Sequence, residues 1–80
     1  MPTLLTVGHY RVVVYLNDHR PAHVHIAGNG YAIVALGNSP EHVRLIEKDG
    51  ITANDLRRVI AEIIDRHEEC LAGWKHIHGN

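Results

Sequence analysis

Three histidines and an aspartate lie together in one short segment of the chain. The segment reads Asn17-Asp18-His19-Arg20-Pro21-Ala22-His23-Val24-His25, and the whole chain has 8 histidines among its 80 residues. Histidine is the commonest metal ligand in proteins and changes its charge near neutral pH. A neighbouring carboxylate can bind the same metal or orient an imidazole ring through a hydrogen bond. These residue types at this spacing predict a site.

The first interpretation of the segment is a metal centre. His23 and His25 are two residues apart on an expected strand, so their side chains share one face, about 6.6 Å apart at the backbone. His19 would add a third nitrogen from the preceding loop, and Asp18 would either ligate the ion or orient a histidine. Three nitrogens plus water are typical of catalytic zinc. If a metal binds, we expect one divalent ion of the Zn, Ni or Cu type.

The second interpretation is a metal-free acid–base site. Cleavage of RNA through its 2′-hydroxyl needs a base, an acid and a cation at the phosphate. The catalytic set would be His23, His25, Asp18 and Arg11, with Arg44 as the alternative cation, and Tyr15 would stack on a base. A third interpretation is that these residues are simply the exposed polar face of an amphipathic strand, with the loop side chains bonded to nearby backbone. The spacing fits all three.

The elements that would position the segment are marked by glycines and by a change of hydrophobic period. Strands are expected over residues 3–7, 9–16, 22–27, 31–36 and 42–47. Gly8 would turn the first hairpin and Gly28-Asn29-Gly30 another, whereas residues 17–21 and 37–40 read as loops.

The last third of the chain predicts one long helix, from about Ala53 to about Ala72. Thr52 would cap its start, and Gly73 would mark its end. Its apolar stripe consists of Leu56, Ile60, Ile63, His67, Leu71 and Trp74. The expected fold is therefore α+β: a single domain over residues 1–80, with a mainly antiparallel sheet of four to five strands and one long C-terminal helix on one face.

Alternation along the strands assigns side chains to the two faces of this sheet. Val24 and Ile26 should face the helix, as should Val43 and Leu45. The opposite, open face should gather Arg11, Tyr15, His23 and His25, with His42 and Arg44 as further candidates. On this assignment His23→Ala and His25→Ala leave the melting temperature nearly unchanged, whereas Trp74→Ala unfolds the protein.

The other histidines carry weaker signals. His67 lies on the apolar stripe and is expected to be a packed residue, whereas His9 and His42 are expected to be exposed. His76 and His78 would lie in a flexible tail, and His78 would join the cluster if the tail folds back.

Composition narrows the classes of function. The formal net charge of −1 means that no strong overall electrostatic field attracts the chain to nucleic acid or anionic lipid. Cys70 is the single cysteine, which excludes an internal disulfide and fits a reducing compartment. No apolar run is long enough to cross a membrane and no signal peptide is evident, so we expect a cytoplasmic protein. A domain this small has a thin stability margin, which makes self-association or docking on a partner reasonable.

The chain resembles a family of small bacterial proteins catalogued as a domain of unknown function. The resemblance covers nearly the whole chain and is most specific at Asp18-His19-X-Pro21-X-His23-Val24-His25; it is weakest over residues 37–48. Other matching residues are Met1-Pro2, Gly8, Tyr10-Arg11, Tyr15, Asn17, Gly50, Leu56-Arg57, Trp74 and His78-Gly79.

The resemblance implies a small α+β fold and a bacterial cytoplasmic origin, but no known activity. Genes of the family often lie beside that of a second small domain, an arrangement similar to a toxin–antitoxin pair. We therefore expect the toxin-like or effector member of a two-protein system, with a small protein partner and with RNA as a candidate target. There are two alternatives: a non-catalytic module that binds a protein partner or has a regulatory role, and a histidine metal-binding module.

Overall fold

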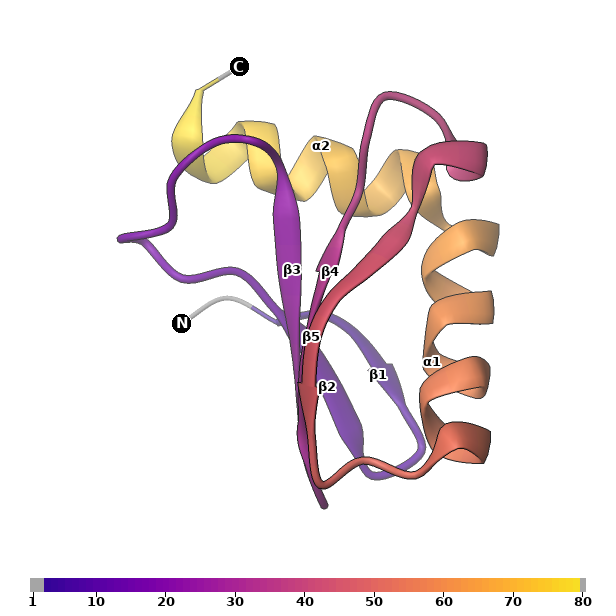
Figure 1. Ribbon diagram of the computed structural model, residues 1–80. Helices are drawn as coiled ribbons and strands as arrows, with labels where there is room; N and C mark the ends of the chain where they lie inside the picture. Colours follow the sequence, from indigo (N-terminus) through magenta and orange to yellow (C-terminus); the bar gives the residue numbers. More distant parts are fainter. Residues whose placement is uncertain (1–2, 80) are drawn as a thin grey trace.

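The protein folds as one five-stranded antiparallel sheet followed by two helices, and the computed structural model describes residues 3–79. The strands lie side by side in sequence order: β1 (Thr3–Val7), β2 (Tyr10–Val13), β3 (His23–Ala27), β4 (Tyr31–Ala35) and β5 (Arg44–Asp49). A 3-10 turn, η1 (Pro40–His42), precedes β5, and helices α1 (Ala53–Asp65) and α2 (His67–His78) follow it (Figure 1). The expected α+β class and the antiparallel sheet are confirmed.

Glycines make the tight connections of this sheet. Gly8 adopts a φ of 59° between β1 and β2, a conformation that costs glycine little. Gly30, in the β3–β4 turn, lies against the backbone of the loop after β5. A Cβ at this position would be 2.6 Å from the nitrogen of Ile51, so only a residue without a side chain fits.

The core is built from one face of the central strands. Val24 and Ile26 of β3 are fully buried, as the alternation predicts. Val34 pairs with Val24, and Val12 pairs with Ile26, so the same apolar layer continues into both neighbouring strands. From α1 the layer receives Leu56, Val59 and Ile63. Burial of each such side chain contributes about 1.5–3 kcal/mol.

The helical region differs from the expected single helix. It is interrupted at Arg66, whose φ of −113° and ψ of 33° end α1. The expected end near Gly73 is wrong: α2 continues to His78, and Gly79, with a φ of 71°, follows it. Gly73 is needed for close packing instead, because a Cβ there would lie 2.5 Å from Cδ2 of Leu4 on β1.

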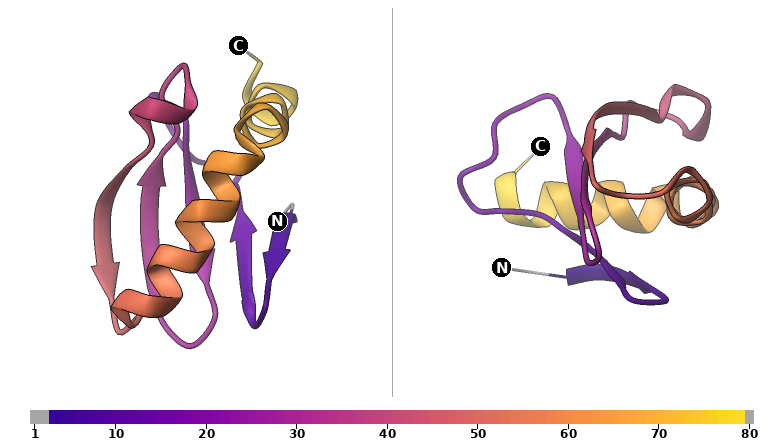
Figure 2. Two further views of the ribbon diagram at one scale, coloured as in Figure 1. Left: turned by 90° about the vertical axis from the view of Figure 1, so that its right-hand side faces the viewer. Right: turned by 60° about the horizontal axis from the view of Figure 1, so that its bottom comes forward.

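The break at Arg66 gives the two helices different directions. α1 lies across one face of the sheet, whereas α2 runs past the ends of the strands to the loop between β2 and β3 (Figures 1 and 2). The segment expected to be a flexible tail is therefore helical. It brings Trp74, which is 2% exposed, to the start of β3.

The face of the sheet opposite α1 is not open, in contrast to the expectation. The chain from Val14 to Ala22 leaves the sheet on this side (Figure 1), and side chains of this loop bond to β3. Val13 lies on the same face of β2 as Arg11 and is fully buried, and His25, its partner on β3, is 7% exposed. Sequence alternation identified the two faces but not the loop that covers one of them.

Smaller corrections concern the ends of strands. β2 stops at Val13 rather than at Leu16, and β5 begins at Arg44, which leaves His42 in η1. Val43 packs against the core as expected, but Leu45 remains 38% exposed because β5 is an edge strand. No helix within residues 3–79 is long and apolar enough to span a membrane.

Candidate functional site

The site begins with a tight turn that follows β2. The backbone N–H of Asp18 donates to the carbonyl of Tyr15 over 3.1 Å, and the Tyr15 N–H donates to Asp18 Oδ2 over 3.0 Å. These two reciprocal bonds fix the carboxylate at the edge of the loop. An aspartate suits this position because its short side chain can accept from a nearby backbone N–H. The second oxygen, Oδ1, is left to point at β3.

His25 meets this oxygen from the middle of β3. Its Nε2 lies 3.0 Å from Asp18 Oδ1, and its Nδ1 lies 3.2 Å from the hydroxyl of Tyr31. Because a carboxylate only accepts, Nε2 carries the proton in this arrangement. Every polar atom of this buried ring is therefore bonded, and the ring also contacts the edge of Tyr15 at a centroid distance of 4.4 Å.

His23 approaches the same carboxylate oxygen from the start of β3. Its Nδ1–H donates to the carbonyl of Pro21 over 2.9 Å, so Nδ1 is the protonated nitrogen of the neutral ring. Its Nε2 lies 3.5 Å from Asp18 Oδ1. The neutral ring thus presents a lone pair toward the carboxylate, an arrangement that becomes favourable when a proton or a metal ion lies between them.

Asp18, His23 and His25 together form a compact ligand set. One ligand atom from each lies within 4.8 Å of the other two. In tetrahedral zinc with bonds of 2.0–2.1 Å, neighbouring ligand atoms are about 3.3 Å apart. The two distances to Asp18 Oδ1, 3.0 and 3.5 Å, bracket that value. Two of the three distances within the set are therefore already close to those around a bound metal ion.

The electrostatics of the cluster favour the charged carboxylate. Burial raises the pKa of Asp18, but the backbone N–H of Tyr15 and the two imidazoles outweigh it, and the net pKa lies below the usual value. Burial, followed by the negative charge of Glu47, raises the pKa of Tyr31, so its hydroxyl stays protonated. Asp18 and His23 side chains are 10% and 16% exposed, so this charge is held in a largely desolvated place.

The C-terminal helix closes the site from one side. Trp74 lies with its ring centroid 5.1 Å from that of His23 and 4.1 Å from that of His78. His78 Nε2–H donates to the carbonyl of Tyr15 over 3.1 Å. The C-terminal segment therefore does fold back toward the cluster, but His78 does not join the ligand set: it bonds to the loop that carries Asp18.

The other residues predicted for the site lie outside the ligand set. His19, the expected third metal ligand, is exposed and does not belong to the ligand set, and Asp18 takes its place. Arg11 is exposed on β2, opposite Ala27. It lies on the same face as His25, but the described residues show no contact between Arg11 and the cluster. Arg44 is also exposed, on β5.

Two features of the site were missed by reasoning from the motif alone: the bond from Tyr31 to His25 and the contact of Trp74 with His23. Tyr31 pairs with Ala27 across the β3–β4 hairpin, which makes it a diagonal neighbour of His25. The hairpin itself was predicted, so its register carried a signal for Tyr31. The position of Trp74 depends on the change of direction at Arg66, which no residue pattern in this part of the chain predicts.

Most of the chain matches one known protein family. The model of the family described as domain of unknown function DUF4160 matches residues 10–75. The chain belongs to the DUF4160 family. All three members of the ligand set, and Trp74, lie inside the matched part of this DUF4160 domain, whereas His78 lies just after it. Met1-Pro2, which also carried the resemblance, lies outside the residues that the structure describes. Neither the curated proteins nor the solved structures gave a match.

Proposed function

We propose that this DUF4160 domain binds one divalent metal ion through Asp18, His23 and His25. The observation that carries the proposal is the orientation of the two imidazoles. Each turns Nε2 toward the same carboxylate oxygen, and each has Nδ1 within hydrogen-bond distance of an outer partner, the Pro21 carbonyl or the Tyr31 hydroxyl. Metal-binding histidines characteristically donate their second N–H to such a partner, which fixes the tautomer and the orientation of the ring.

The donor set also suggests which metals fit. Two imidazoles and one carboxylate suit Zn, Ni or Cu better than Ca or Mg, which prefer oxygen ligands. Three protein ligands leave one position for water in a tetrahedral zinc site. A metal bound there would supply Lewis acidity and an activated water. In this arrangement Asp18 would neutralise part of the metal's charge, and Pro21 and Tyr31 would hold the histidine rings in place.

Metal binding would move one proton of His25 from Nε2 to Nδ1. In the hydrogen-bonded state His25 Nε2–H donates to Asp18. Binding of a cation at Nε2 requires the neutral tautomer with the proton on Nδ1, which Tyr31 Oη can accept. Affinity should therefore fall as the pH decreases, because protons compete for the imidazoles.

Matched histidine variants test this proposal. We expect tag-free wild-type protein to bind one zinc ion per chain in isothermal titration calorimetry, and His23→Ala to bind at least about tenfold more weakly. His19→Ala is the control, because His19 belongs to the same segment but lies outside the ligand set. Equal loss in both variants, or unchanged binding in His23→Ala, would contradict the assignment.

We further propose that the biological role of this domain is that of the effector in a small two-protein system, with a small protein as its partner. The support is the resemblance of the histidine motif to a family of small bacterial proteins whose genes often lie beside that of a second small domain. Metal-free RNA cleavage is the weaker chemical candidate, since Arg11 makes no contact with the cluster among the described residues. Expression in a bacterium separates the roles: equal growth with wild type and with His23→Ala would argue against an effector that works through this site.

A further inference from the structure

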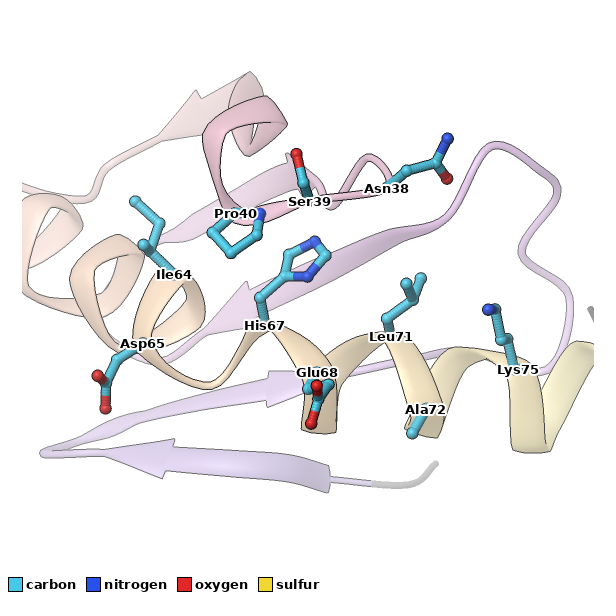
Figure 3. Close-up of a pocket in the computed structure, with 10 residues that line it drawn as sticks. All are labelled: Asn38, Ser39, Pro40, Ile64, Asp65, His67, Glu68, Leu71, Ala72 and Lys75. Carbon is cyan, nitrogen blue, oxygen red and sulfur yellow. The ribbon is translucent and has the colours of Figure 1, made fainter.

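A hollow beside α2 shares no residue with the ligand set. It is a groove of about 610 Å³ between α2, the end of α1 and the segment from Asn38 to Pro40 (Figure 3). None of the three proposed metal ligands lines it. The metal site therefore leaves this groove unexplained.

One buried side chain faces this groove with an unused polar atom. His67 is 5% exposed, and its Nε2–H donates to the carbonyl of Leu36 over 2.8 Å. In the neutral ring Nδ1 is then an acceptor, and it has no hydrogen-bond partner among the described residues. Every fully buried side-chain nitrogen or oxygen of these residues has a partner. Because Nδ1 has none, it is not fully buried, and a ligand in the groove can contact it. Figure 3 shows the ring turned toward Ser39 and Pro40.

The groove also has a cationic end and an apolar middle. His67, Leu71 and Lys75 are spaced four residues apart, so they lie along one face of α2 over about 12 Å. Asn38 lies above Leu71 in this view, and Pro40 and Ile64 lie at the end of the groove away from Lys75 (Figure 3). The carboxylates of Asp65 and Glu68 point away from the His67 ring in this view.

We propose that this groove binds a small organic acid with an apolar body and an N–H or O–H group. The acid would pair with Lys75 and accept from the Asn38 amide. The apolar body would cover Leu71, and the donor group would bond to Nδ1 of His67. A preformed, mostly apolar hollow with a few fixed polar groups is the usual form of a small-molecule site. The proposal does not depend on whether a metal binds.

The experiment uses three probes that differ in one group each. Indole-3-acetate has an acid, an apolar ring and an N–H; 3-methylindole lacks the acid, and naphthalene-1-acetate lacks the N–H. Binding is followed in ¹H–¹⁵N NMR spectra of the whole chain, together with the imidazole nitrogen signals. We expect saturable shifts for indole-3-acetate at residues 38–40 and 67–75, and a shift of His67 Nδ1 that naphthalene-1-acetate does not produce.

Charge variants complete the test without disturbing the buried histidine. Lys75→Gln should weaken the binding of indole-3-acetate by about two- to fivefold, as expected for a partly exposed ion pair. The same change should leave the binding of 3-methylindole unaffected. Lys48→Gln is the control, because Lys48 is exposed on β5 and does not line this groove. Equal affinity in Lys75→Gln and wild type, equal binding of all three probes, or the absence of saturable shifts at these residues would overturn the proposal.

Discussion

Replacement of His25 by alanine should destabilise the protein strongly, although the sequence pattern alone assigns this residue to an exposed face. The change removes a hydrogen bond to the Asp18 carboxylate at 3.0 Å and one to the Tyr31 hydroxyl at 3.2 Å. A bond to a charged group contributes about 1.5–3 kcal/mol and a neutral one about 1 kcal/mol. A loss of about 2–4 kcal/mol is a large share of the total stability of a small domain.

Thermal unfolding of the metal-free protein measures this loss. In the presence of a chelator, the melting temperature of His25→Ala should fall by roughly 10–25 °C, since about 1 kcal/mol shifts a domain of this size by 4–8 °C. His76→Ala is the matched control, because His76 is exposed on α2 and should change the melting temperature by little. His23→Ala should lie between them, since His23 makes one hydrogen bond to a backbone carbonyl.

A melting temperature for His25→Ala within a few degrees of wild type would refute this reasoning. It would mean that the loop from Val14 to Ala22 does not depend on the bond between Asp18 and His25. The face opposite α1 would then be open, as the strand alternation suggests.

Three further predictions follow from other contacts. The pKa of Asp18 is lowered in the folded state, so its stabilising effect is present above its unfolded pKa of about 3.9 and is lost as the pH falls through the folded pKa. The difference in urea stability between wild type and Asp18→Asn should therefore shrink below about pH 4. A difference that grows on acidification would contradict this prediction. Gly73→Ala should cost about 1–3 kcal/mol, because the new Cβ would meet Leu4 Cδ2 at 2.5 Å; the exposed neighbour Ala72, changed to Ser, is the control in the same melting experiment. Burial raises the pKa of Cys70 to about 11, so its thiol should react with a disulfide reagent at pH 8 only after unfolding, and rapid reaction in the folded protein would show that the core is open there.

The sheet could be predicted from the sequence because its signals are local. Gly8 and the Gly28–Gly30 turn mark two hairpins, and the alternation of Val24 and Ile26 with His23 and His25 separates the two faces of β3. The cluster of Asp18 with His23 and His25 was also accessible, since the three residues lie within eight positions of one another.

The contacts of the C-terminal helix and the loop that cover the site could not be predicted in the same way. It depends on long-range contacts, such as the bond from His78 to the Tyr15 carbonyl, which joins residues 63 positions apart. Gly73 looked like a helix end because glycine is common there, but it serves close packing against Leu4. His19 and Asp18 are adjacent in the loop, and only the turn at Tyr15 decides that the carboxylate, rather than the imidazole, points at β3.

Imidazole NMR during a zinc titration tests the proposed metal site most directly. The measurement follows the ring nitrogens of all eight histidines in tag-free protein as one equivalent of zinc is added. The proposed site predicts that Nε2 of His23 and of His25 shift together and saturate at one zinc ion per chain, while the signals of His19 and His76 stay unchanged. If His23 and His25 do not respond, or if exposed histidines such as His19 bind first, the Asp18–His23–His25 metal site is wrong.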